Sequence, residues 1–317
     1  MKRKIFVDGM SGTTGLKIHE RLALYPELEL IAIDYEKRRD PAVRAGCLNE
    51  ADLVFLCLPD EAAREAVGLV TNPDTRIIDA STAYRTAPDW TYGLPELSKA
   101  HREAVRNSKR VSNPGCHATA FILAAYPLVA GGAMPSDYPV TCQSLTGYSG
   151  GGKSLIEKYE QNDGRNEYAG APRPYALTLN HKHLPEMTKH AGLKEEPLFL
   201  PILGNNYKGM AVMLSLHTRL LSKQPTARDI HELLSEHYHK EAFVKVLPFM
   251  REEDLFDGGL DITACNDTNH AEIFVFGNAS KGTAVIMTRI DNLGKGASGA
   301  AIQNMNIMLG FDEGLHL

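Results

Sequence analysis

Cysteine is scarce in this chain, and its spacing excludes a common use of that residue. The 317 residues contain five cysteines, at positions 47, 57, 116, 142 and 265, and no two of them form a Cys-x-x-Cys pair. An odd number of widely spaced cysteines argues against a disulfide framework. The pattern is typical of the reducing cytoplasm, where we expect this protein to act.

Excess positive charge and long apolar runs are also absent. The formal net charge is −5, so we expect neither nucleic acid nor an anionic membrane surface as a partner. No apolar run is long enough to cross a bilayer. The basic start is similar to a signal peptide, but its apolar part ends at Asp8, and we interpret residues 4–7 as a first strand.

A glycine-rich turn follows that strand. The turn is Gly9-Met10-Ser11-Gly12-Thr13-Thr14-Gly15, and a helical stretch over 16–24 comes next. A strand, a glycine-rich turn and a helix place a pyrophosphate at the helix N-terminus. We therefore expect the cofactor to contact Gly9, Ser11, Gly12, Thr13, Thr14 and Gly15. The spacing GxxGxxG is not the standard GxGxxG, and a plain tight turn is the alternative.

More apolar strands follow this turn. They are expected over 28–33, 53–58 and 76–79, with a helical segment over 61–70 among them. Continuous apolar strands that alternate with helices predict a parallel sheet covered on both faces. The first half of the chain is therefore expected to be an α/β, Rossmann-like domain. The full length also leaves room for a second domain with its own core.

The end of the second predicted strand carries conflicting signals about the cofactor. Asp34 suits the free ribose hydroxyls of NAD, whereas Lys37, Arg38 and Arg39 suit the extra phosphate of NADP. We favour NADP, with Arg38 as a ligand, because three cations in one loop can neutralise a phosphate. A solvated run of charges is the alternative.

Polar residues follow the fourth predicted strand, which ends at Asp79. Ser81 and Arg85 lie just beyond it, at the carboxyl edge of the sheet, where ligands bind in such folds. An arginine there can hold a phosphate or a carboxylate through two hydrogen bonds. A surface ion pair is the alternative for Arg85.

The stretch Asn113-Pro114-Gly115-Cys116-His117-Ala118-Thr119-Ala120 carries the strongest chemical signal. Pro114 and Gly115 interrupt the backbone, and the apolar run over 118–129 predicts a helix that begins near Cys116. A helix N-terminus favours a thiolate, which is the nucleophilic form of cysteine. Our central hypothesis is that Cys116 forms a covalent intermediate. The alternative is a buried structural cysteine.

A second glycine-rich loop follows a predicted strand over 140–145. It contains Ser149-Gly150-Gly151-Gly152-Lys153, and such a loop can cradle a phosphate, with Lys153 as an added cation. It lacks the GxxxxGK[ST] spacing of a nucleotide-hydrolysing P-loop. A mobile loop near the active site and a flexible connector are the alternatives.

Two histidines stand at i and i+2 in His181-Lys182-His183-Leu184-Pro185-Glu186. In an extended segment they would point the same way, and a histidine can shuttle a proton near neutral pH. Metal binding is the alternative, but the spacing supplies no third ligand, so we expect no metal. Capping of a loop or simple exposure would also explain the pair.

The second half of the chain predicts an α+β domain with a mixed, mostly antiparallel sheet. Its strands are expected over 198–203, 210–220, 244–247, 272–276 and 284–290, and an amphipathic helix over 227–239. Small residues from Ala297 on permit a closely packed helix, which we expect to return to the first domain. Residues 1–115 and 296–317 are predicted to form the domain that binds the cofactor. Residues 116–295 are predicted to form the domain responsible for catalysis and dimerisation.

Five motifs together point to one family. They run in order along the chain: the first glycine turn, Tyr92-Gly93-Leu94-Pro95-Glu96-Leu97, the Cys116 stretch, the His181 stretch and Asp291-Asn292-Leu293-Gly294-Lys295-Gly296-Ala297. On these motifs the sequence resembles the shorter form of the N-acetyl-gamma-glutamyl-phosphate reductases, relatives of aspartate-semialdehyde dehydrogenase. Two features depart from the family. His117 follows the cysteine where an aromatic residue is common, and Ser149-Gly150-Gly151-Gly152-Lys153 stands where many members carry an SGAGR-like loop.

The resemblance implies an enzyme of arginine biosynthesis. Its reaction would be the NADPH-dependent reduction of N-acetyl-gamma-glutamyl phosphate to N-acetylglutamate semialdehyde, through a cysteine thioester. Cys116 would be the nucleophile and His181 the acid/base. Glu186 would orient the histidine, and His183 is the alternative acid/base.

The resemblance also implies where the ligands bind. It places NADP at the first glycine turn and Asn292 near the nicotinamide. As a hypothesis we assign Arg85, Asn113, Lys153 and His183 to the substrate, a small acyl phosphate. As in related enzymes, the antiparallel domain would carry the subunit contact of a homodimer or homotetramer.

Other functions are compatible with the same residues. The chemistry could act on another acyl phosphate, either aspartyl phosphate or a carrier-linked amino-adipyl phosphate. A chain with an inert Cys116 could instead be a non-catalytic NADP-binding regulator. A cysteine hydrolase would explain Cys116 and His181 but would leave the first half of the chain unused.

Overall fold

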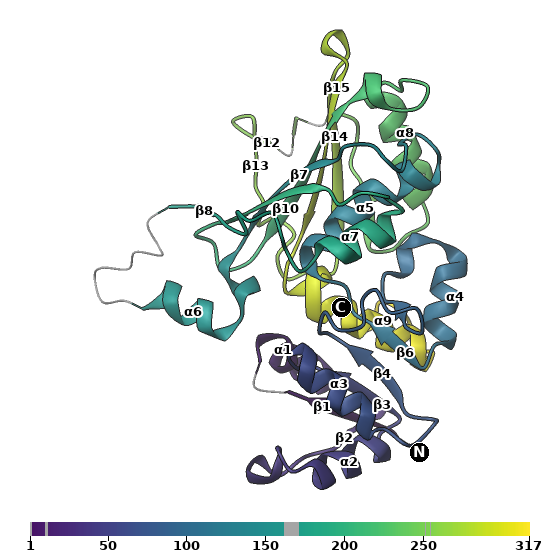
Figure 1. Cartoon of the computed structure of the whole chain (residues 1–317), viewed down its shortest axis with the longest axis vertical. Coiled ribbons are helices and arrows are strands. Elements are labelled where there is room, and N and C mark those ends of the chain that lie inside the picture. The colour runs from purple at the N-terminus through teal and green to yellow at the C-terminus, as the bar shows by residue number, and fades with distance from the viewer. Residues whose placement is uncertain (1, 10–11, 162–170, 251, 254) are drawn as a thin grey trace. The chain divides into compact units, whose positions relative to one another are not determined.

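The computed structural model describes residues 2–9, 12–161, 171–250, 252–253 and 255–317. The chain divides into two compact units (Figure 1): unit 1 comprises Met1–Pro114 and Ala297–Leu317, and unit 2 comprises Gly115–Gly296. Each unit is built around its own sheet. Among the described residues, no helix has the length and apolarity needed to cross a membrane.

Unit 1 contains a six-stranded sheet in the order β2-β1-β3-β4-β6-β5, and its pairings are parallel. Its strands are β1 (Arg3–Asp8), β2 (Leu28–Leu30), β3 (Leu53–Leu56), β4 (Arg76–Asp79), β5 (Thr91–Tyr92) and β6 (Arg110–Ser112). All residues of β3 are buried. The predicted parallel sheet is confirmed, although β2 is shorter than the strand expected over 28–33.

Helices cover both faces of this sheet. Val7 of β1 lies in one core with side chains of α1, α4 and α9, and Phe6 lies in a second core with side chains of α2 and α3. Successive residues of a strand point to opposite faces, so both faces are buried, as continuous apolar strands require. The helices are α1 (Thr13–Leu22), α2 (Pro41–Glu50), α3 (Asp60–Leu69), α4 (Lys99–Asn107) and α9 (Gly299–Leu309).

Unit 2 contains a seven-stranded sheet in the order β11-β14-β15-β10-β7-β9-β8. Its strands are β7 (Thr141–Thr146), β8 (Arg173–Pro174), β9 (Leu198–Leu203), β10 (Met210–His217), β11 (Val244–Val246), β14 (Ala271–Asn278) and β15 (Thr283–Ile290). The pairs β11/β14 and β7/β9 are parallel, and the other pairs are antiparallel. This confirms the predicted mixed, mostly antiparallel sheet. A separate small hairpin joins β12 (Leu255–Phe256) to β13 (Gly259–Leu260).

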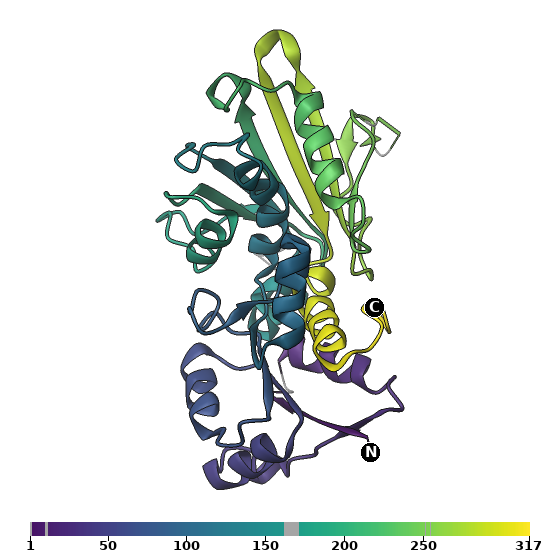
Figure 2. The same ribbon diagram turned by 90° about the vertical axis from the view of Figure 1, so that its right-hand side faces the viewer.

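The helices of unit 2 are α5 (Cys116–Ala130), α6 (Lys153–Glu160), α7 (Leu184–Ala191) and α8 (Ala227–Tyr238), of which α5 and α8 pack against the second sheet. The α5 helix contacts β10, β15, α7 and α8, and it is apolar all round because it is buried among them. Figure 2 shows α8 beside the long hairpin of β14 and β15.

Two predicted segments of unit 2 differ from the structure. The strand expected over 210–220 ends at His217, and a 3-10 turn covers Thr218–Leu220. The second glycine-rich loop is an ordered 3-10 turn over Tyr148–Gly151, and α6 begins two residues later at Lys153.

Candidate active site

The described residues of the first glycine turn, Gly9 and 12–15, have features that suit an anion. Gly9 has φ of +95°, and a Cβ there would lie 2.2 Å from the carbonyl oxygen of Cys57, so only glycine fits. Gly12 precedes α1, whose first turn holds Thr13 and Thr14, no acidic residue and no side-chain cap. Backbone N–H groups at such a helix start can bind a phosphate. Gly15 is buried inside α1, and Ser11 lies outside the described residues.

The carboxyl edge of the same sheet holds a buried acid. Asp79 ends β4, and its carboxylate accepts hydrogen bonds from the Ser81 hydroxyl at 2.6 Å and the Ser81 backbone N–H at 3.2 Å. Burial raises the pKa of Asp79 to about 6, although the bonds from Ser81 oppose that rise. The predicted cofactor residue Ser81 is therefore held by this carboxyl group.

Asp79 makes the stability of the protein depend on pH. Its pKa is raised on folding from 3.8 to about 6, so the native state binds the proton more tightly than the unfolded state does. This contribution is complete below pH 3.8 and is lost as pH rises towards 6. The asparagine of the Asp79→Asn variant cannot ionise, so the variant does not lose this stability as pH rises. The free energy of unfolding of the variant minus that of wild type should therefore increase by up to about 3 kcal/mol between pH 3.8 and pH 6.

Urea unfolding of wild type and Asp79→Asn, at pH values on either side of this window, measures the difference. Asparagine cannot copy both bonds from Ser81, so a constant offset between the two proteins is expected at every pH. A difference that does not change with pH would show that Asp79 does not titrate in this range.

Arg85 and Asn113 hold the end of β6 within unit 1. Arg85 is buried, and its guanidinium donates to the carbonyl oxygens of Asn113 at 3.0 Å and Ala80 at 3.2 Å. The amide of Asn113 donates to the carbonyl of Ala297 at 2.9 Å and accepts from Asn304 at 3.3 Å. Both residues therefore fix the backbone that leads to Pro114 and the cysteine.

The loop after β2 contains the residues that bear on the choice of cofactor. Asp34 uses its carboxylate to cap the 3-10 turn Tyr35–Lys37, by accepting from the N–H of Glu36 at 3.0 Å. The Arg38 guanidinium lies 3.3 Å from the centre of the Tyr35 ring and also donates to the Tyr35 carbonyl. The loop thus holds a positively charged group in a defined position.

Cys116 is the first residue of α5, as predicted, and it is half-buried. Two neighbours within unit 2 hold this helix start. The N–H of Gly115 donates to the Glu186 carboxylate at 3.2 Å. A Cβ on Gly296 would lie 2.7 Å from the Cβ of Cys116, so the backbone of Gly296 packs directly against the cysteine. The first turn of α5 itself contains no acidic residue, so the Glu186 carboxylate on Gly115 is the negative group that faces the positive end of this helix.

Three histidine rings gather close to this helix start. The centroid of the His117 ring lies 5.5 Å from that of His181 and 5.4 Å from that of His183. The centroids of the His181 and His183 rings are 4.8 Å apart. The expected extended segment over 181–183 is wrong, because His183 has helical dihedrals and precedes α7 directly. Pro185 in the first turn of α7 favours that helix start. The rings still meet, through a turn.

The surroundings of His181 suit the transfer of a proton. Burial lowers the pKa of His181 to about 4, and a smaller effect of Lys182 acts in the same direction. The ring is therefore neutral near pH 7. Its Nδ1 accepts from the backbone N–H of His183 at 3.2 Å, which assigns the single ring proton to Nε2. That N–H group can donate to an oxygen.

The other predicted residues of unit 2 are placed as follows. Glu186 is buried, with one carboxylate oxygen on Gly115 and the other 3.9 Å from Nε2 of His183. The amide of Asn292 donates to the Ser149 hydroxyl at 3.0 Å and accepts from the N–H of Gly209 at 2.9 Å. Lys153 is exposed, 4.0 Å from Glu157.

Several residues of the site were not singled out from the sequence. His117 is buried, with Nδ1 2.8 Å from the Ser144 hydroxyl and Nε2 3.0 Å from the Tyr175 hydroxyl. The Phe199 ring lies 5.2 Å from the rings of both His117 and His181. Only His117 gave a signal in the sequence, as the departure after the cysteine. Tyr175 belongs to a polar stretch without periodicity.

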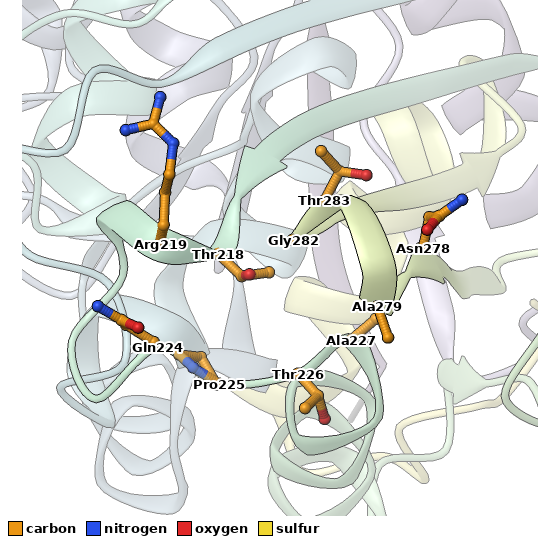
Figure 3. Close-up of a pocket in the computed structure, with 10 residues that line it drawn as sticks. All are labelled: Thr218, Arg219, Gln224, Pro225, Thr226, Ala227, Asn278, Ala279, Gly282 and Thr283. Carbon is orange, nitrogen blue, oxygen red and sulfur yellow. The ribbon is translucent and has the colours of Figure 1, made fainter.

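Unit 2 also contains a cavity of about 240 Å³. It lies between the start of α8 and the turns that follow β10 and β14 (Figure 3), and Thr226, Asn278 and Thr283 are among its lining residues. The Thr226 side chain is engaged in the capping box of α8 with Asp229. None of the predicted site residues lines this cavity.

Comparison with known proteins identifies the family. Residues 4–107 match the family described as semialdehyde dehydrogenase, NAD binding domain, and residues 116–292 match semialdehyde dehydrogenase, dimerisation domain. The chain is 48% identical to N-acetyl-gamma-glutamyl-phosphate reductase 2 of Nostoc sp., over 100% of this chain and 99% of that protein.

Solved structures share the fold. Aspartate semialdehyde dehydrogenase II from Vibrio cholerae has a TM-score of 0.72 at 13% identity, and the match covers 98% of this chain and 99% of that one. Aspartate semialdehyde dehydrogenase with NADP from Candida albicans has a TM-score of 0.64 at 15% identity, with the same coverage. Because both domains match semialdehyde dehydrogenase families and the relative in Nostoc sp. is similar over its full length, the chain belongs to the N-acetyl-gamma-glutamyl-phosphate reductase family of oxidoreductases.

Proposed function

We propose that this protein is a cytoplasmic enzyme of arginine biosynthesis that reduces N-acetyl-gamma-glutamyl phosphate to N-acetylglutamate semialdehyde with NADPH. The observation that carries the proposal is Cys116 at the start of α5, near a neutral His181 whose Nε2 bears a proton. The name of the full-length relative in Nostoc sp. supports the same substrate. The five cysteines form no disulfide, which fits a reducing compartment.

The chain's own residues account for the covalent steps. The Cys116 thiolate attacks the acyl carbonyl carbon, the bond to phosphate breaks, and a thioester remains on the enzyme. The backbone N–H groups at the start of α5 stabilise the oxyanion. NADPH, when bound, supplies the hydride that reduces the thioester carbonyl. His181 gives a proton to the oxygen of the resulting thiohemiacetal. It takes this proton back as the carbon–sulfur bond breaks, so that the aldehyde leaves and the thiolate is restored.

Other residues have roles in binding. The first glycine turn of unit 1 would hold the NADP pyrophosphate, with Ser81 at the same edge of the sheet and Asn292 in the turn proposed to meet the nicotinamide. Lys153 offers an exposed cation to the substrate. Arg85, Asn113 and His183 are also proposed to contact the substrate; the hydrogen bonds of Arg85 and Asn113 to the main chain support a positioning role as well.

The reverse reaction tests the proposal most directly. The purified protein is supplied with N-acetylglutamate semialdehyde, phosphate and NADP, and the absorbance of NADPH is followed. We expect reduction of NADP that requires phosphate and fails with aspartate semialdehyde. Turnover with aspartate semialdehyde alone would support the same mechanism with a different substrate. Tight binding of NADP without turnover on any aldehyde would indicate a non-catalytic NADP-binding regulator.

Arg38 should set the preference for NADP over NAD. Arg38→Ala removes a guanidinium that the Tyr35 ring holds in place, and a hydrogen bond to a charged group contributes enough to change affinity by about 10- to 100-fold. We therefore expect the KM for NADP to rise by this factor while the KM for NAD stays constant. Equal effects on both cofactors would show that Arg38 does not contact the extra phosphate.

We also propose that the enzyme is a homodimer or homotetramer that associates through the face of the unit 2 sheet opposite α5. Its half-exposed apolar residues are Leu145, Leu200, Ile202, Met213, Val285 and Met287, and the polar Thr141, Gln143 and Thr283 lie among them. The alternation along β7, β9, β10 and β15, together with their pairing register, places these side chains on one face. The match of residues 116–292 to a dimerisation domain supports the proposal that this unit carries the subunit contact. A mass of one chain in light scattering would contradict it.

A further inference from the structure

The cluster of His117, His181 and His183 contains more imidazole groups than the proposed proton transfer needs. One ring nitrogen of each histidine lies within 4.8 Å of a ring nitrogen of each of the other two. The sequence spacing showed only two of these residues as a pair, because His117 comes from a distant part of the chain. Three convergent imidazoles are a common donor set for Zn²⁺.

The charges around the cluster decide whether a cation can bind there. A metal ligand must be a neutral imidazole, and His117 and His183 are buried, which disfavours a charged ring. The positive charge of Lys182, next to His181 in the chain, opposes a cation. The carboxylate of Glu186, 3.9 Å from Nε2 of His183, acts in the opposite direction.

The rings also have the partners that commonly orient histidines at a metal. The hydroxyl of Ser144 lies 2.8 Å from Nδ1 of His117, so a proton on Nδ1 leaves the lone pair on Nε2. A metal there takes the place of the Tyr175 hydroxyl, 3.0 Å away. At His181 the metal must displace the N–H of His183 from Nδ1 or the proton from Nε2. Carboxylate and hydroxyl partners of this kind raise metal affinity about 10- to 100-fold.

We propose that His117, His181 and His183 form a reversible binding site for Zn²⁺, at which the metal inhibits the enzyme. Zn²⁺ fits this donor set because it accepts three imidazoles and a water in tetrahedral geometry. Binding uses lone pairs alone and leaves the thiol of Cys116 unchanged. The inhibition rests on the proposed function, because a metal-bound His181 cannot transfer a proton, whereas the binding does not depend on that function.

The test uses the full-length protein without a histidine tag, after removal of metal with EDTA. Co²⁺ is the spectroscopic probe, and we expect one Co²⁺ per chain, with visible absorption of a tetrahedral site that Zn²⁺ displaces. His117→Phe should abolish these bands and weaken Zn²⁺ binding by more than about 100-fold. Ser144→Ala should weaken Zn²⁺ binding by about 10- to 100-fold. The control is His239→Gln, an exposed histidine after α8, which should bind like wild type.

The outcomes separate the two proposals. No Co²⁺ binding would overturn the site. Binding that survives His117→Phe, with sulfur-to-metal charge transfer in the near ultraviolet, would place the metal on a cysteine and overturn it too. If His117→Phe does not fold, Ser144→Ala decides. Co²⁺ binding in a protein without reductase activity would uphold the site while the proposed function fails. In an active enzyme, Zn²⁺ must inhibit over the concentration range in which it displaces Co²⁺.

Discussion

Replacement of Cys116 by serine should abolish turnover, with kcat lower by on the order of 10⁴- to 10⁶-fold, the range seen when members of a catalytic triad are removed. Serine fits the space beside Gly296, where the backbone packs against the Cβ of residue 116. Its hydroxyl, however, is hardly ionised near neutral pH, and an alkoxide is a poor leaving group in the final step. The reverse assay with N-acetylglutamate semialdehyde, phosphate and NADP measures the loss.

A matched control comes from another half-buried cysteine, Cys47 of α2. Cys47→Ser should keep the wild-type kcat, because α2 packs against the unit 1 sheet and contributes no predicted site residue. Alkylation gives an independent measurement: iodoacetamide should inactivate the wild type as Cys116 becomes labelled. Full turnover by protein labelled at Cys116 would refute the role of this residue as nucleophile.

His181→Asn is expected to lower kcat by about 10²- to 10⁴-fold, the usual contribution of a general acid or base. The asparagine side chain can still accept from the N–H of His183, as Nδ1 of His181 does, so the turn before α7 should persist. The KM for the aldehyde should change little, because the lost group acts on the transition state. Steady-state kinetics of the reverse reaction separate kcat from KM.

The same measurement on His183→Asn decides between the two histidines. His183 lies beside Glu186, which binds Gly115, so its loss should affect the position of the cysteine more than proton transfer. Rates of alkylation at Cys116 read this difference: they should be unchanged in His181→Asn and altered in His183→Asn. A larger loss of kcat in His183→Asn, with normal alkylation, would make His183 the acid/base.

The sequence predicted the elements whose pattern is set by burial. The continuous apolar strands of unit 1 and the start of α5 after Gly115 are present in the structure. The helix α2 was not predicted, because one of its buried residues is Arg44, which is paired with Asp8 at 2.9 Å. A charged residue counts as exposed in any apolar pattern, although a partner can carry it into the core.

The site shows a similar limit. The sequence indicated Cys116 and His181, because each stands in a short motif with its own chemistry. It did not indicate that Ser144 and Tyr175 flank His117, since these contacts join a strand, a helix and a loop far apart in the chain. The extended conformation expected for 181–183 was wrong because Pro185 starts α7 there. Local spacing alone does not encode such tertiary contacts.

The two-part composition of unit 1 has a consequence for synthesis on the ribosome. Its parallel sheet is complete once β6 has been made, yet Ile302 and Met305 of α9, which is translated only after unit 2, belong to the core on one face of that sheet. The α1 and α4 helices already cover part of that face, but the part that α9 covers stays exposed while all of unit 2 emerges. Domains fold as units during synthesis. Unit 2, which is continuous in the chain, can therefore be finished first, and nascent chains stopped before α9 would expose the apolar face to chaperones and proteases.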